Sequence, residues 1–396
     1  MDDGVERWVR ERRIQMQHPP YVLEEYEALR KMLRRFVKNE IEPHVEAWEE
    51  NGAFPRDLLD KLKQLGLLGM SFPEELDGQG GDDFSVIIMA EELGRAGAGG
   101  FVLALMCHAE LATSVLGFLG TAEQVERYFK PALAGEKLVA YGLSDFPPQA
   151  NRSPALRAVM DGNGWVVSGT KRLVPLASQA ELIVFAARSD DGAKEEKWTL
   201  FVAELDRPGI AIEERRQLVG LQSMDVADVA FDWVRLTQEN VLGSVGGAFS
   251  FMERLWYREC LIRSAICLGM AQCAYDLART YAKERHVFQR PLSRFQVPAH
   301  LLAEMAVEIE AVRQLVYGAA YRFVQGEENG NDAVLARVSS AQTAHWVADR
   351  ALQLFGGYGY MMEYPIQRVW RDTRWFRMSG GTDEQLKVWM AERMGC

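Results

Sequence analysis

The first third of the chain carries apolar residues at helical spacing. Over residues 21–67, apolar positions fall among charged ones at intervals of three and four, which predicts amphipathic helix. The glycine-rich stretch 73–81 interrupts this pattern, and apolar helix-like runs resume at residues 84–93 and 101–118. The N-terminal third is therefore expected to be helical.

The middle of the chain has a different pattern. Between about residues 138 and 242, short β-rich runs alternate with turn residues, which predicts a small β domain. From Gly247 onward we expect long helices again, with breaks at residues 326–331 and 356–359. The clearest β runs are Gly164–Gly169, Leu182–Ala186, Thr199–Ala203 and Val229–Val234.

Composition narrows the class of protein. With 396 residues, 48% of them hydrophobic, the chain has material for a large core divided into two or three subdomains. A formal charge of -11 argues against an electrostatic nucleic-acid surface and against binding to an anionic membrane. We expect no leader and no apolar window long enough to span a membrane. The five cysteines lack metal-ligand spacing, so we expect reduced thiols in a cytoplasmic protein without a metal site.

Motifs occur in six segments, in order and spread over nearly the whole chain. They are Pro73-Glu-Glu with the glycines after it, Gly169-Thr-Lys171, Gly220-Leu-Gln-Ser-Met-Asp225, Asn240-Val-Leu-Gly243, Glu284-Arg285-His-Val-Phe288, and Gln353-Leu-Phe-Gly-Gly357 with Gly380-Gly-Thr-Asp-Glu384. Each segment alone is a weak signal. Taken together, the six segments make the chain resemble the acyl-CoA dehydrogenase superfamily.

This resemblance implies a mainly α fold with a β domain. The implied domains are an N-terminal α-helical domain over residues 1–138, a middle β-barrel domain over 139–243 and a C-terminal four-helix bundle over 244–396. FAD is the implied cofactor, held where the β domain, the bundle and a neighbouring subunit meet in a homotetramer or dimer. The implied activity is α,β-dehydrogenation of an acyl-CoA thioester, or its reverse, with an electron-transfer flavoprotein as electron acceptor.

The family needs a carboxylate base that removes the α-proton of the thioester. In much of the family this glutamate directly precedes the Gly-Thr of the C-terminal loop, and here that position is Gly380. Another branch, with isovaleryl-CoA dehydrogenase-like members, places it on the first helix of the bundle, and ungapped counts from both sides put Glu259 there. The resemblance therefore implies Glu259 as base, ahead of Glu253. A salt-bridged helix carboxylate is the alternative for Glu259.

Four further residues are assigned to the substrate side of the site. Gly380 and Gly381 form the loop in which the usual base stands, and Arg258 directly precedes Glu259, about 100° around a helix. His108 lies on an apolar helix that borders the acyl pocket in the family. A hydrogen-bonded core histidine is the other interpretation of His108.

The flavin-binding motifs are altered in one half and intact in the other. Ser144 keeps a hydroxyl, but Gln149 and Ala150 replace the family's Gly-Ser pair, and Pro175 replaces a threonine that bonds flavin N5. The residues that in the family reach an FAD bound mainly by the neighbouring subunit are retained. The resemblance implies as cofactor-binding residues Ser144, Arg285, Phe288, Gln296, Gln353, Gly356, Gly357, Thr382 and Glu384.

Three functions stay open at this point. The first is an FAD-dependent oxidoreductase on the CH-CH group of an acyl-CoA, with Glu259 as base. The second is a non-catalytic or FAD-lending subunit of a hetero-oligomer, or a pseudoenzyme. The third is a flavin-dependent oxidase or monooxygenase on the same fold. A glutamate at a recognised base position favours the first.

Overall fold

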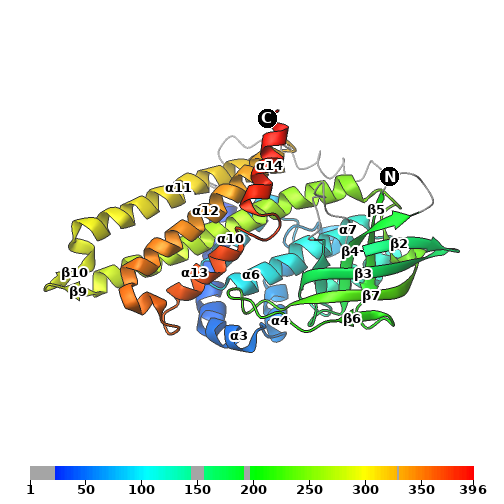
Figure 1. Cartoon of the computed structure of the whole chain (residues 1–396), viewed down its shortest axis with the longest axis horizontal. Coiled ribbons are helices and arrows are strands. Elements are labelled where there is room, and N and C mark those ends of the chain that lie inside the picture. The colour runs from blue at the N-terminus through cyan, green and yellow to red at the C-terminus, as the bar shows by residue number, and fades with distance from the viewer. Residues whose placement is uncertain (1–22, 144–155, 191–196, 328–329) are drawn as a thin grey trace.

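The protein is an elongated body of helices with a β-sheet at one end (Figure 1). The long helix α10 (Ala248–Glu284) runs from the sheet to the far end of the helices. The computed structural model describes residues 23–143, 156–190, 197–327 and 330–396.

The N-terminal region is helical, as its apolar spacing predicts, but residues 21–67 do not form one continuous helix. Gly52 ends α3 in the left-handed conformation, with φ 73°, and Pro55 follows three residues later. The helices of this region are α2 (Glu24–Phe36), α3 (Val45–Asn51), α4 (Asp57–Gln64), α5 (Asp83–Gly94), α6 (Gly99–Met106), α7 (Thr113–Leu119), α8 (Ala122–Gln124) and α9 (Lys130–Leu133).

One stretch of this region corrects an expectation about membrane segments. The run Gly99–Leu119, which joins α6 and α7 through the π-helical turn Cys107–Ala112, is long and apolar enough to cross a membrane by length and composition alone. The expectation that no window reaches that length is therefore wrong. Most of the run is buried inside the protein, and a helix that is covered on all sides by a core needs the same composition.

The middle third folds into one eight-stranded sheet, in the order β6-β7-β3-β2-β4-β5-β8, with β1 pairing β4. On β4, Ile183 and Phe185 face a core enclosed by the sheet, whereas Leu182 and Val184 face the helices. Both faces are covered, so the strand is apolar from Leu182 to Ala187. The four predicted β runs all lie in strands. The strands are β1 (Val139–Gly142), β2 (Leu156–Asp161), β3 (Gly164–Pro175), β4 (Leu182–Asp190), β5 (Lys197–Glu204), β6 (Ile210–Ile212), β7 (Val226–Thr237) and β8 (Val241–Leu242).

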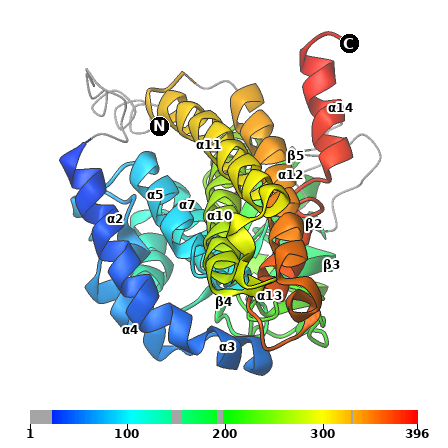
Figure 2. The same cartoon turned by 90° about the vertical axis from the view of Figure 1, so that its left-hand side faces the viewer.

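The C-terminal third is a set of long helices packed around α10 (Figure 2). Every residue of α10 from Leu255 to Ala271 is buried, so polar side chains in this stretch must find partners inside the protein. The two predicted breaks, at residues 326–331 and 356–359, do separate helices, but helices also break at residues 285–295 and 376–382, which the pattern did not predict. The remaining elements are β9 (His286–Val287), β10 (Arg290–Pro291), α11 (Gln296–Val324), α12 (Gly330–Phe355), α13 (Ile366–Trp375) and α14 (Asp383–Arg393).

Candidate active site

A buried carboxylate on α10 is bonded through both of its oxygens. Glu259, 5% exposed, accepts a hydrogen bond on Oε1 from Arg263 Nε at 2.7 Å, and Arg263 Nη2 lies 2.6 Å from the same oxygen. Tyr141 donates its hydroxyl to Oε2 at 2.8 Å. These charge-assisted contacts replace the water that a carboxylate loses when it is buried.

Two elements bring these three residues together. Glu259 and Arg263 lie one turn apart on α10, where residues four positions apart share a face. Tyr141 comes from β1, 118 residues earlier in the chain. Successive side chains of a strand point to opposite faces, so Ala140 enters the core of the sheet while Tyr141 packs on the helical side.

Burial sets the ionisation of the groups around Glu259. Burial, and then the negative charge of Glu259, raise the pKa of Tyr141 well above its usual value, so the phenol keeps its proton and remains a donor. Burial also raises the pKa of the nearby Cys107 to about 12, so this thiol stays neutral. Burial lowers the pKa of Arg263, but Glu259 raises it, and the net direction is upward. The site therefore contains a charged pair and a neutral phenol.

The loop before α14 contacts Arg263. Arg263 Nη1 donates to Ser379 Oγ at 3.1 Å. Gly380 follows in the left-handed region with φ 70°, and a Cβ built there would lie 3.3 Å from Arg263 Cζ. A guanidinium therefore fills the space beside the position at which much of the family carries its base.

Arg258 points to other partners than Glu259 does. Its Nε donates to Asp83 Oδ1 at 2.5 Å and its Nη2 to Glu110 Oε2 at 2.5 Å, with Ser71 Oγ 3.0 Å away. Adjacent residues of a helix face about 100° apart, and the two side chains of this pair accordingly reach different neighbours. These contacts support a structural role for Arg258.

His108 lies in the π-helical turn, with 1% of its surface exposed. Its Nδ1 accepts the backbone N–H of Val139 at 3.2 Å, which ties the turn to the start of β1. Burial lowers the pKa of His108 to about 4, so the ring is neutral at ordinary pH. This geometry supports the interpretation as a hydrogen-bonded core histidine.

One group of the predicted cofactor residues lies at the end of the bundle that is farthest from the sheet, around β9 and β10 (Figure 1). The Arg285 guanidinium lies 5.9 Å from the centre of the Tyr358 ring, and Phe288 is 87% exposed. Among the described residues, nothing lies within 4 Å of a Cβ built on Gly357 or on Gly356. Contacts within this chain therefore do not explain why position 357 is a glycine. Also exposed at this end are Gln296 and Gln353.

The second group lies at the start of α14. The Thr382 hydroxyl caps this helix by accepting the N–H of Gln385 at 3.2 Å, and Glu384 is exposed in the first turn. Asp383 is bonded to Gln342 of α12, which stands eleven residues before Gln353. At 1.5 Å per residue the two groups are roughly 16 Å apart along α12. The structure therefore separates two sets of residues that the sequence motifs placed together.

The flavin-binding half expected from the chain itself is described only in part. Ser144, Gln149 and Ala150 lie outside the described residues. Pro175 pairs with Val226 at the end of β3, and Leu173, two residues earlier, has φ 53° and donates its N–H to Asp228 Oδ1 at 2.8 Å. Proline offers no hydrogen-bond donor at this position.

Three residues of this site were not identified from the sequence. Arg263 carries a usable signal, because a cation four residues after a glutamate on a helix is a standard pairing. Tyr141 and Ser379 carry none, because only the tertiary fold brings them to α10.

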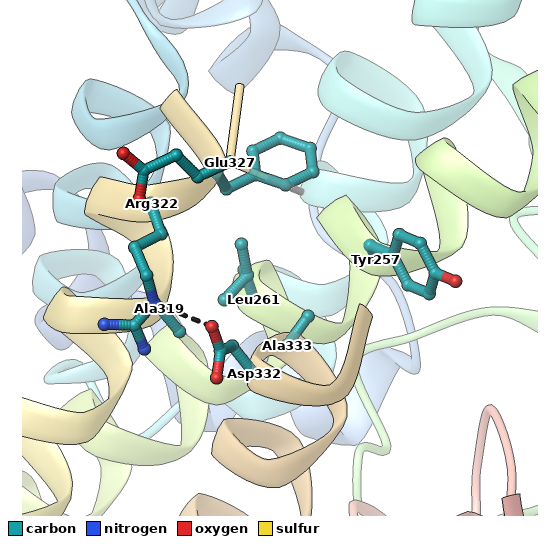
Figure 3. Close-up of a pocket in the computed structure, with 8 residues that line it drawn as sticks. Tyr257, Leu261, Ala319, Arg322, Glu327, Asp332 and Ala333 are labelled. Atoms are coloured by element: carbon teal, nitrogen blue, oxygen red, sulfur yellow. Dashed lines mark hydrogen bonds and ion pairs between the residues drawn. The ribbon is translucent and has the colours of Figure 1, made fainter. Parts of the chain in front are cut away.

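A small hollow lies on another face of α10, where Tyr257 and Leu261 face the ends of α11 and α12 (Figure 3). Arg322 Nε donates to Asp332 Oδ2 across its edge at 2.7 Å. The free volume of this hollow is about 10 Å³, which is close to the smallest volume that can hold one water molecule. It is too small for a substrate. No group of His, Cys, Asp and Glu that could hold a metal ion occurs among the residues that the structure describes.

Three family models match successive parts of the chain. They are described as acyl-CoA dehydrogenase N-terminal domain, over residues 23–136, middle domain, over 148–234, and C-terminal domain, over 247–395. The chain is 34% identical over 367 residues to the short-chain specific acyl-CoA dehydrogenase of Clostridium acetobutylicum, which covers 92% of this chain and 96% of that protein. The chain belongs to the acyl-CoA dehydrogenase family.

Two further likenesses agree with this assignment. The caffeyl-CoA reductase-Etf complex subunit CarC of Acetobacterium woodii is 30% identical over 366 residues, 92% of this chain and 96% of that protein. The butyryl-CoA dehydrogenase of Megasphaera elsdenii has a TM-score of 0.88 at 28% identity, covering 95% of this chain and 99% of that one. Membership makes the chain an acyl-CoA dehydrogenase-like oxidoreductase that acts on acyl-CoA, with FAD as its cofactor. The family, fold and cofactor inferred from sequence are confirmed.

Proposed function

We propose that this chain catalyses α,β-dehydrogenation of an acyl-CoA thioester, or its reverse, with Glu259 as the base for the α-proton. The position of Glu259 carries the proposal. Its partner Arg263 bonds Ser379, and its guanidinium lies beside the point where a side chain at Gly380, the position of the glutamate in much of the family, would begin. Glu259 on α10 therefore takes the role of the loop glutamate that Gly380 replaces.

Hydrogen bonds to Glu259 single out one oxygen for the proton. A carboxylate oxygen has two lone-pair sites. Oε1 accepts the hydrogen bond from Arg263 Nε and lies in ion-pair contact with Nη2, so it is covered by the guanidinium, whereas Oε2 accepts one bond from Tyr141. The remaining site is on Oε2, so this atom takes the α-proton. Arg263 and Tyr141 act as positioning residues that keep the carboxylate from rotating.

FAD, when bound, supplies the hydride acceptor for the β-carbon. The residues around β9 and the end of α12 fit a cofactor that approaches from outside the chain. Arg285 offers an exposed cation, Phe288 an exposed ring, and Gly357 a backbone that can be approached closely. Pro175 supplies packing alone. The fit is therefore better for a cofactor shared with a second subunit than for one held by this chain alone.

The proposed function involves two protein partners, a second copy of the chain and an electron acceptor. A second copy of the chain, in a homotetramer or dimer, would bring the Arg285 and Gly357 end of one subunit to the FAD of the other. An electron-transfer flavoprotein is the electron acceptor that we propose, because the name of the related subunit CarC places that protein in a complex with one.

Replacing Glu259 by Gln tests the base. General-base catalysis contributes roughly 10²–10⁴-fold, so Glu259→Gln is expected to lower the rate at which an acyl-CoA reduces the bound flavin by that factor. Glu253→Gln is the matched control, because Glu253 lies on the same helix but pairs with Arg393 and Tyr257. Equal rates for the wild type and Glu259→Gln would reject the base.

Pro175 favours a second candidate, an FAD-lending subunit of a hetero-oligomer. That function requires that the purified chain carry no flavin and acquire it only with a partner chain. Flavin content and oligomeric mass, measured on the protein expressed alone, separate the two candidates. A homo-oligomer with one FAD per chain supports the enzyme, and a colourless chain supports the lending subunit.

A further inference from the structure

Three arginines surround the loop before α14, and two of them, Arg263 and Arg337, are buried. Arg263 reaches it from α10, Arg337 from α12 and Arg377 from the end of α13. Two of these have carboxylate partners, since Glu259 pairs with Arg263 and Asp383 pairs with Arg377 at 2.8 Å. Arg337 has no ion-pair partner in the described part of the chain.

Arg337 is 1% exposed and is bonded only in part. Its Nη2 donates to the carbonyls of Phe376 and Ser379, the latter at 3.0 Å, while its Nε and Nη1 have no hydrogen-bond partner among the described residues. Burial lowers the pKa of Arg337, and Arg263 lowers it further. A buried charge without a counter-charge is costly. An anionic group at this loop would offset that cost.

Arg263 has hydrogen-bond donors left for such a group. A guanidinium has five N–H donors. Three of them serve the two contacts to Glu259 and the one to Ser379. Two remain, on Nη1 and Nη2, and these two nitrogens form the planar fork that binds a carboxylate through both oxygens.

We propose that Arg263 selects acyl-CoA substrates whose acyl chain carries a carboxylate. The inference rests on the proposed function, because it places the acyl group beside Glu259. Arg263 bonds the base directly, so a carboxylate held by its free fork stands only a few bonds beyond the carbon that loses its proton. A dicarboxylic acyl group meets this requirement, and a plain fatty acyl group brings only a methyl to the same place.

Pairs of substrates that differ in one end group test the selection. Pentanoyl-CoA is compared with glutaryl-CoA, and hexanoyl-CoA with adipyl-CoA, in flavin reduction by the holoenzyme. A hydrogen-bonded charged group corresponds to roughly 10- to 100-fold, so the wild type is expected to prefer the carboxylated member by that ratio in kcat/KM. Arg263→Leu slows both reactions and removes the preference, whereas Arg263→Lys retains part of it.

Binding measurements keep the inference independent of turnover. Calorimetric affinity for adipyl-CoA should fall in Arg263→Leu, and affinity for hexanoyl-CoA and for free CoA should not. Arg254→Leu, on the same helix and 5.3 Å from the Phe323 ring centre, is the control for loss of an arginine. A wild-type preference for the uncharged member, or an equal loss of affinity for free CoA, overturns the inference. Carboxylate-selective binding without flavin reduction by any acyl-CoA would instead reject the proposed dehydrogenation.

Discussion

His108 shows how one buried residue makes the stability of this protein depend on pH. Burial lowers its pKa to about 4, against about 6.5 for a histidine in an unfolded chain. Between pH 6.5 and about pH 4, His108 is therefore protonated in the unfolded chain and neutral in the folded chain. The contribution of His108 to stability is full above pH 6.5 and is lost as the pH falls to about 4.

The size of this effect follows from the shift. The two pKa values differ by more than two units, which corresponds to roughly 3 kcal/mol. Replacing His108 by Gln keeps an acceptor for the N–H of Val139 and removes the titration. We expect the free energy of unfolding, measured by urea between pH 7 and pH 4, to fall less steeply in His108→Gln than in the wild type.

The control for this prediction is His300→Gln, because His300 is exposed on α11. This variant should follow the wild-type pH dependence. Parallel curves for the wild type and His108→Gln would show that the ring is not buried in its neutral form.

Single residues also mark where prediction from sequence stops. Glu259 is found by counting along the chain, because motifs on both sides fix its position on one helix. Its donor Tyr141 is not found, because no local pattern links a strand residue to a helix 118 positions later. The pairing of Arg263 with Glu259 could have been predicted from their four-residue spacing on a helix. Only the structure shows that this pair is buried and therefore belongs to the site.

At the scale of elements, Arg258 connects α10 to the N-terminal helices. It bonds Asp83 of α5 and Glu110 of the π-helical turn, and Glu110 is fully buried. Burial raises the pKa of Glu110, and the charge of Arg258 opposes this. The ion pair therefore holds a carboxylate that would otherwise be unstable in the core.

Removing one member of this pair should destabilise the protein strongly. Arg258→Met leaves Glu110 buried without its cation, and breaking a buried pair in this way costs about 3–5 kcal/mol. The double variant with Glu110→Gln should recover part of the loss. Urea unfolding measures both, and KM for an acyl-CoA is expected to stay unchanged in the double variant. A raised KM with unchanged stability would instead assign Arg258 to substrate binding.

Elements differ in how well their bounds follow from sequence. The helix α12 begins and ends near the predicted breaks, because local chemistry sets these limits, whereas β4 continues to Asp190, beyond the predicted end at Ala186. The region 21–67 divides at Gly52, whose left-handed φ a periodicity analysis does not weigh. The run Gly99–Leu119 has the composition of a membrane segment, because composition alone cannot separate a helix buried in protein from one buried in lipid.

At the scale of the whole molecule, the predicted cofactor residues fall at two separate places along α12. Thr382 and Glu384 lie beside its middle, next to Gln342, whereas Gln353 and Gly357 lie exposed at its end. A site that uses both groups is completed by two subunits more simply than by one. Gly357 gives the sharpest test of a cofactor contact at the end of α12, because no described residue of the chain lies within 4 Å of a Cβ built there.

Replacing Gly357 by Ala adds one methyl group that meets nothing within 4 Å among the residues that the structure describes. The stability of the isolated subunit is therefore expected to stay the same, while a cofactor that approaches the backbone closely would be displaced. We expect Gly357→Ala to bind less FAD per chain, measured by absorbance after gel filtration. Gly318→Ala, a methyl added near the end of α11 at 3.7 Å from Arg322 Nη1, should keep full flavin content. If the two variants retain equal FAD, the end of α12 does not contact the cofactor, and the shared site must be placed elsewhere.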